Sequence, residues 1–141
     1  MVIVAAVDRS DKADTVMKEA ATLSEAFDNE IHVVHVMTQS EFVQLERTNV
    51  NKTDDPIDME RIREIAAKVA ADAVEVIERP AKTVGLVGGP AERIVDYADK
   101  NDARFIVVSP QKRSPTGKAV FGSVAQKVLL NANAPVLAVA N

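Results

Sequence analysis

Residues 2–8 read VIVAAVD, six apolar side chains followed by an acidic one. A continuous apolar run of this length is typical of a strand that is buried on both faces of a parallel sheet. Directly afterwards, apolar positions recur at helical spacing, which predicts a helix over residues 12–28 with Ser10 or Asp11 as its cap. The change of period at Asp8 therefore predicts a strand that leads straight into a helix.

The same alternation continues to the end of the chain. Apolar runs predict four further strands, within residues 31–36, 83–90, 104–109 and 135–140. Helical spacing and proline signals predict three further helices, which begin at Asp55-Pro56, at Pro90 and at residue 123. Their predicted ends are Arg79-Pro80, a left-handed Asn101 and residue 131, and the first helix is predicted to end at Asp28-Asn29.

Two connections lack a clean period. Residues 37–57 form a stretch of a length that is usually functional or mobile in a compact domain, and we expect a variable loop there with at most one helical turn around residues 42–45. Residues 109–123 read SPQKRSPTGKAVFGS, and we expect a second loop between the fourth strand and the last helix.

The alternation predicts an α/β fold in one domain, residues 1–141, with no linker or internal repeat. The predicted sheet is doubly wound, with five parallel strands in the order 3-2-1-4-5 and helices on both faces. Ligands of such sheets bind beyond the carboxyl ends of the strands at the switch point, here between strands 1 and 4. Asp8 and residues 109–123 are expected to meet there.

Composition excludes several classes of function. The chain has no cysteine, which excludes disulfides and thiolate chemistry and favours a cytoplasmic location. No apolar run reaches the length of a membrane span, and the first residues do not resemble a signal peptide. A net charge of −4 argues against extended nucleic-acid binding. The basic cluster of Lys112, Arg113 and Lys118 is local and suits a small anion.

Familiar site motifs are incomplete. Gly117-Lys118 is followed by Ala119 rather than Ser or Thr, so the phosphate loop of nucleotide hydrolases is not present, and the first strand lacks the glycines of a dinucleotide fingerprint. His32 and His35 lie three residues apart on a predicted strand, so their rings face opposite sides and cannot share a metal ion. We expect structural or solvent-facing roles for both and no catalytic triad.

Ser123 and Asp8 each leave two interpretations open. Ser123 with Gln126 three residues later matches a capping box, and a helix start also favours a bound anion. Ser123 therefore either caps its own helix or helps to bind an anion. Asp8 either caps the following helix or offers a carboxylate to a ligand at the switch point.

Several segments together resemble the universal stress protein family. They are VDRS after strand 1, HV at the end of strand 2, GGPAERIVDYA after strand 3 and FGSVAQKVLLNANAPVLAV near the end of the chain. The resemblance covers the chain except for the variable stretch 37–57. It implies an adenine-nucleotide α-hydrolase-like fold and, in nucleotide-binding members, a loop GxxG, nine residues, then G and Ser or Thr. That loop holds ribose and phosphates beside magnesium or manganese.

Carried onto this chain, the resemblance implies an ATP or adenine-nucleotide site. Adenine would be contacted by Asp8 and the backbone near Val36, ribose and phosphates would lie by Ser109 and Lys112, and the phosphates would bind to Gly122, Ser123 and Val124. Ser109 and Lys112 stand where the family has its two loop glycines, so the loop must take another shape. Its basic residues either neutralise a triphosphate or form a solvated loop.

Two functions follow from these observations. The first is a nucleotide-binding regulatory protein of the stress response, with at most slow ATP hydrolysis because no general base is identified. The second is a dimeric interaction module of the same family that no longer binds nucleotide, as the replaced glycines suggest. An enzyme of the wider fold group is disfavoured, since its SGGxDS and HxGH motifs are not present. The apolar last strand and the resemblance both imply a homodimer paired through that strand.

Overall fold

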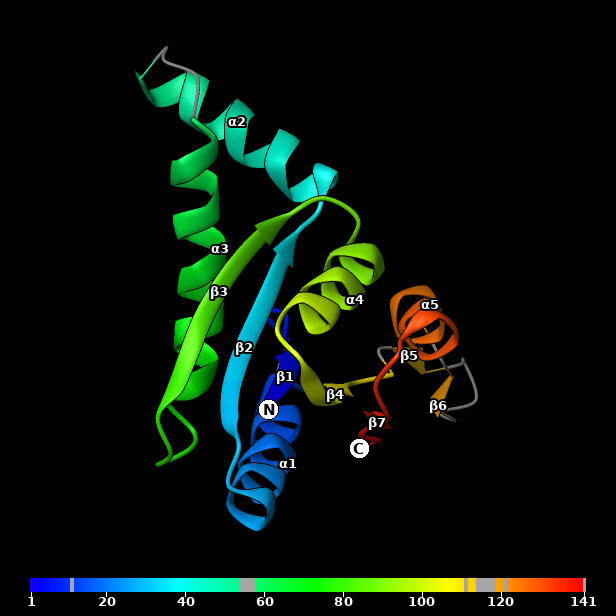
Figure 1. Cartoon of the computed structure of the whole chain (residues 1–141). Helices are drawn as coiled ribbons and strands as arrows, with labels where there is room; N and C mark the ends of the chain where they lie inside the picture. Colours follow the sequence, from blue (N-terminus) through cyan, green and yellow to red (C-terminus); the bar gives the residue numbers. More distant parts are fainter. Residues whose placement is uncertain (11, 54–57, 111, 114–118, 121, 141) are drawn as a thin grey trace.

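The computed structural model describes residues 1–10, 12–53, 58–110, 112–113, 119–120 and 122–140, with the backbone alone at 48–53, 112–113 and 119–120. Its centre is a five-stranded parallel sheet in the order β3-β2-β1-β4-β7 (Figure 1). This confirms the predicted order 3-2-1-4-5. The strands are β1 Val2–Ala6, β2 Glu30–Met37, β3 Ala81–Val87, β4 Ala103–Val108 and β7 Val136–Ala138.

Helices cover both faces of the sheet, as predicted (Figure 1). One face packs against α1 (Lys12–Phe27) and α3 (Met59–Val74), and the other against α4 (Pro90–Lys100) and α5 (Ser123–Asn131). Successive residues of β1 alternate between the two cores, Ile3 in the first and Val4 in the second, and both are fully buried. A strand buried on both faces explains why its sequence is a continuous apolar run.

The helix α3 lies unusually close to the edge strand β3. A Cβ atom on Gly85 would lie 2.1 Å from the carbonyl oxygen of Arg63 and 2.4 Å from the nitrogen of Ala67. Only a residue without a side chain allows this approach. Small buried residues of α3, including Ala66, Ala70 and Ala73, complete the close contact.

The prediction of a loop over residues 37–57 is wrong, because a helix, α2 (Gln39–Thr53), occupies most of it. Thr38 and Glu41 form a capping box in which Thr38 Oγ1 accepts from Glu41 N–H at 3.2 Å and Glu41 Oε1 accepts from Thr38 N–H at 3.5 Å. Phe42 and Leu45 pack on Met37. These two apolar positions are too few to give a clear helical period.

The boundaries of α3 also differ from those predicted. Asp58 caps the helix by accepting from Arg61 N–H at 2.7 Å, whereas Asp55 and Pro56 lie outside the described residues. The helix ends at Val74 rather than Arg79, because a tight turn follows in which Ile77 N–H donates to Val74 O. Ile77 reaches the core from this turn, so its apolar position fits the helical period without belonging to the helix.

Three other local predictions concern the ends of α1 and α4 and the loop at residues 109–123. Asp28 (φ 52°) ends α1 as predicted, but Asn101 (φ −109°) is not left-handed, and Asp102 (φ 53°) takes that conformation instead. Asn101 donates its side-chain amide to Tyr97 O at 2.8 Å. The predicted loop 109–123 contains a short antiparallel pair, β5 (Lys112–Arg113) with β6 (Ala119–Val120). Within the described residues, no helix is both long and apolar enough to span a membrane.

Candidate functional site

A cavity of about 220 Å³ lies at the carboxyl edge of the sheet. Its walls come from the ends of β1, β2 and β4 and from the first turns of α2, α4 and α5. We refer to it as the edge pocket. It opens at the switch point between β1 and β4, where the strand order predicts a ligand site.

The structure brings four of the seven predicted site residues together. Asp8, Val36, Ser109 and Val124 all line the edge pocket. Two further ones precede Val124 in the chain: Gly122, which is buried, and Ser123, which is exposed. Lys112 belongs to β5, and its side chain lies outside the described part of the structure, as do all of Lys118 and the side chain of Arg113.

Asp8 is tied to the entrance of α1. Its Oδ1 accepts from Ser10 N–H at 2.9 Å and from Ser10 Oγ–H at 2.5 Å, and Ser10 Oγ accepts in turn from Lys12 N–H at 3.3 Å. Asp8 therefore supports the helix start through Ser10 instead of capping it directly. Asp11, the other predicted cap, lies outside the described residues. Because Asp8 also lines the edge pocket, its support of the helix start is compatible with a contact to a ligand there.

The start of α5 differs from the predicted capping box. Gly122 occupies the cap position, with no side-chain hydrogen bond to the helix, and Ser123 is the first helical residue. The first backbone hydrogen bond of the helix runs from Gln126 N–H to Gly122 O at 3.1 Å. The amides before Gln126 have no acceptor within the helix, so the start of α5 carries N–H donors and the positive end of the helix dipole beside the pocket.

The peptide groups of Val36 face the edge pocket. Peptide groups of alternate residues in a strand point to opposite neighbours. On β2, Val34 O accepts from Val7 N–H at 2.9 Å on the β1 side, and Met37 O accepts from Gly88 N–H at 3.0 Å on the β3 side. Val36 therefore directs its N–H and C=O toward the β1 side, past the point where β1 ends.

Sequence reasoning missed one wall of the pocket, formed by His35, Thr38 and Glu41. His35 is 3% exposed; its Nδ1 lies 2.9 Å from Val7 O and its Nε2 lies 3.4 Å from Glu41 Oε2. The signal that could have located this wall is the Thr-x-x-Glu pattern of the capping box directly after strand 2.

His32 lies away from the pocket under α4. Its Nδ1 is hydrogen-bonded to Tyr97 Oη at 2.7 Å, and its Nε2 lies 3.5 Å from Glu30. Burial is the main reason that the pKa of His32 lies below its ordinary value of 6.5, while the hydrogen bond to Glu30 opposes that shift. The two histidines thus have separate partners, and no group of three potential metal ligands occurs among the described residues.

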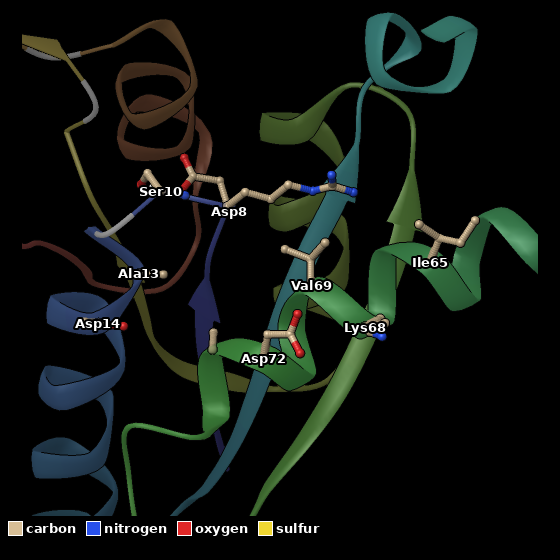
Figure 2. A pocket seen from close by; sticks show the side chains of 10 residues that line it. Asp8, Ser10, Ala13, Asp14, Ile65, Lys68, Val69 and Asp72 are labelled. Carbon is tan, nitrogen blue, oxygen red and sulfur yellow. Dashed lines mark hydrogen bonds between the residues drawn. The ribbon is translucent and has the colours of Figure 1, made fainter. Parts of the chain in front are cut away.

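A larger cavity of about 410 Å³, which we call the helix cleft, lies between the first turn of α1 and α3 (Figure 2). It shares Asp8 with the edge pocket, and its floor includes Ala13 and Val69. Its charged rim combines Asp14 and Asp72 with Lys68 and is exposed. Charges of both signs facing water do not converge on one ligand group, so the edge pocket is the better candidate site.

The comparisons with known proteins agree with one another. A model of the universal stress protein family matches residues 1–140. The chain is similar to universal stress protein MJ0531 of Methanocaldococcus jannaschii, with 30% identity over 144 residues, 97% of this chain and 80% of that protein.

Two solved structures from Archaeoglobus fulgidus are also similar. A universal stress protein has 31% identity and a TM-score of 0.61, with 97% of this chain and 96% of that chain covered. A universal stress protein in complex with dAMP has 25% identity and a TM-score of 0.56, with 97% of this chain and 94% of that chain covered.

Proposed function

The chain belongs to the universal stress protein family, and from this premise we propose that it binds ATP or a related adenine nucleotide in the edge pocket as a regulatory protein of the stress response. The observation that carries the proposal is the meeting of Asp8, Val36, Ser109 and Val124 around one cavity at the switch point. The complex of a 25% identical relative with dAMP supports the same ligand class.

The base fits the pocket better than the whole nucleotide does. The volume of about 220 Å³ is below the range of roughly 300–1,000 Å³ that is usual for pockets that enclose complete ligands. Apolar side chains such as Ile94 and Val108 offer surfaces for a flat ring. The N–H and C=O of Val36 complement N1 and the 6-amino group of adenine, and Asp8 offers a further acceptor.

The phosphates would then lie outside the pocket at the start of α5. The amides of Ser123 and Val124 and the Ser123 hydroxyl would bind them at the positive end of the helix dipole. Ser109 and Lys112 would lie by ribose and phosphates. Magnesium or manganese would be held mainly by the phosphates and water, as is usual for Mg²⁺, because the described residues offer no cluster of metal ligands.

The second candidate is a dimeric interaction module without a nucleotide. It is favoured by Ser109 and Lys112 in place of the family's loop glycines, because side chains there hinder a close approach of backbone to phosphates. In both cases we propose a homodimer paired through β7, the edge strand of the sheet. Leu129 and Leu130 on the neighbouring α5, 46% and 73% exposed, add apolar surface beside this edge.

Calorimetry with ATP and Mg²⁺ tests the nucleotide site. We expect binding by the natural chain, loss of that binding in a Gly122→Val, Ser123→Ala double variant, and no change in a control, Thr22→Ala, on the exposed surface of α1. No heat for the natural chain across millimolar ATP would support the interaction module. Equal binding by the double variant would exclude the α5 start as the phosphate site.

Size-exclusion chromatography with light scattering tests the dimer. Charged residues at both Val136 and Val139 are expected to give monomers, since they would place like charges along the paired edge. A doubly charged variant that remains dimeric would rule out pairing through β7.

A further inference from the structure

The hydrogen-bond ladder between β1 and β2 stops one step early at the edge pocket. Its last registered pair is Ala6 with Val34, and Val7 N–H still donates to Val34 O at 2.9 Å. In a parallel ladder the next bond would run from Val36 N–H to Val7 O. Both residues are described, and the structure has no hydrogen bond from Val36 N–H to Val7 O.

His35 takes the acceptor that this missing bond would use. Its Nδ1 lies 2.9 Å from Val7 O. A carbonyl oxygen only accepts, so Nδ1 carries the proton and donates to it. Because the ring is buried, it holds this place without competition from bulk water. The side chain of one strand residue thus replaces the backbone donor of the next residue.

The His35 ring is contacted from the opposite side by α2. Glu41 Oε2 lies 3.4 Å from Nε2 of His35, and it accepts a hydrogen bond there only from a ring that carries protons on both nitrogens. The other carboxylate oxygen of Glu41 accepts from Thr38 N–H and from Thr38 Oγ–H, at 3.5 and 3.4 Å. The same capping box that begins α2 therefore also places a carboxylate beside the imidazole, whose hydrogen bond to Val7 O holds it at the end of β1.

We propose that His35 is a positioning residue of the edge pocket, which withholds Val7 O from the ladder and so keeps the Val36 N–H directed at the ligand. The ligand class is a flat heterocycle with an acceptor and a donor side by side, as adenine has at N1 and its 6-amino group. This inference rests on the proposed nucleotide site for its ligand. The arrangement of Val7, His35 and Val36 itself is independent of that site.

Amide hydrogen exchange of the ligand-free protein, followed by NMR, tests the arrangement alone. We expect the Val36 amide to exchange faster than the Val34 amide, which lies within the ladder, by about tenfold or more. In His35→Leu the Val36 N–H gains Val7 O as its partner, and its exchange slows by about tenfold. His35→Asn retains a donor close to the position of Nδ1, so it is expected to keep the fast exchange.

His32→Asn is the matched control, because it changes the other buried histidine of β2 without reaching Val7. Its Val36 exchange should equal that of the natural chain. If His35→Leu does not fold, His35→Gln serves instead, since its amide reaches toward Glu41 and leaves Val7 O to the backbone. Slow Val36 exchange in the natural chain, or unchanged exchange in the folded Leu or Gln variant, would overturn the proposal.

Titration with ATP then connects the arrangement to binding. We expect His35→Leu to weaken ATP binding about tenfold, which corresponds to roughly 1.4 kcal/mol, and His35→Asn to recover most of the lost affinity. Equal affinity of the natural chain and the Leu variant would contradict a positioning role. If the natural chain does not bind ATP, the nucleotide proposal fails, while the exchange result still decides what His35 does to the ladder.

Discussion

The helix cleft is the larger of the two cavities, yet the smaller edge pocket is the better candidate for a binding site. The cleft is nearly twice as large, about 410 against 220 Å³, but its polar groups are exposed side chains of both signs. The pocket is bounded by the ends of three strands and the starts of three helices, where backbone groups have no partner within their own element, whereas the cleft adjoins one helix start, that of α1. We therefore base the choice of candidate site on directed backbone groups rather than on volume.

The largest effect is expected where the cleft meets the sheet. α3 is a wall of the cleft but not of the edge pocket, and its position depends on Gly85. Gly85→Ala places a Cβ 2.1 Å from Arg63 O, so we expect α3 to move and the free energy of unfolding to fall by about 3 kcal/mol. Chemical denaturation measures this loss.

Gly89→Ala is the control for that substitution. Its Cβ would approach the Glu92 carboxylate no closer than 3.8 Å, an ordinary contact. A loss of stability in Gly85→Ala no larger than that in Gly89→Ala would show that α3 is not held by the close approach to β3.

A second prediction contrasts the two cavities directly. Val124→Asp adds a negative charge at the start of α5, on the wall of the edge pocket and next to the proposed place of the phosphates, so we expect ATP affinity to fall about tenfold, or roughly 1.4 kcal/mol. Lys68→Ala changes the charged rim of the cleft instead and is expected to leave ATP affinity unchanged. Calorimetry compares the two variants.

The reverse outcome would place the nucleotide site in the helix cleft instead of the edge pocket. This would follow if Lys68→Ala weakens ATP binding and Val124→Asp does not. Thermal unfolding of both variants shows whether a loss of fold is the cause of weaker binding. We expect Val124→Asp to remain folded, since an acidic residue in the first turn of a helix is favourable for the helix itself.

The smallest expected effect concerns His32, the β2 histidine that lies outside both cavities. Burial lowers its pKa in the folded chain, so the unfolded chain takes up the proton first as the pH falls. The contribution of His32 to stability is therefore complete above about pH 6.5 and is lost as the pH falls toward its folded pKa. His32→Asn should show a shallower decline in the free energy of unfolding just below pH 6.5.

Denaturation at closely spaced pH values between about 7 and 5.5 tests this. Parallel declines in the natural chain and in His32→Asn would show that His32 binds its proton equally well in the folded and unfolded chains. The variant also loses its hydrogen bond to Tyr97, which lowers stability at every pH by about 1 kcal/mol and does not alter the slope.

The sequence predicts the sheet well because each strand contains an apolar run. VIVAAV could be recognised as β1 since residues on both of its faces are buried, and strand order followed from general rules of handedness. Helix α2 was missed because Phe42 and Leu45 are its only described apolar residues in the core. The end of α3 was placed too late because Ile77 continues the apolar spacing from a turn.

The meeting of residues in the candidate site was predicted in part for a similar reason. Asp8, Ser109 and Val124 follow strands or begin a helix at the switch point, so topology brings them together. His35 and Glu41 were not identified, because the contacts of His35 with Glu41 of α2 and with Val7 after β1 depend on side-chain geometry. Gly122 rather than Ser123 caps α5, since Gly122 has the extended backbone of a cap residue (ψ 162°) and Ser123 is already helical; the serine pattern does not show this difference of one residue.

NMR titration of the ¹⁵N-labelled chain with ATP and Mg²⁺ distinguishes the edge pocket from the helix cleft, because it reports on both cavities in one experiment. If the nucleotide binds in the edge pocket, the amide signals of Val36, Ser109 and Val124 will shift with one common saturation curve, while those of Lys68 and Asp72 in the helix cleft will not. Shifts confined to the cleft, or none at millimolar ATP, would contradict a nucleotide site in the edge pocket.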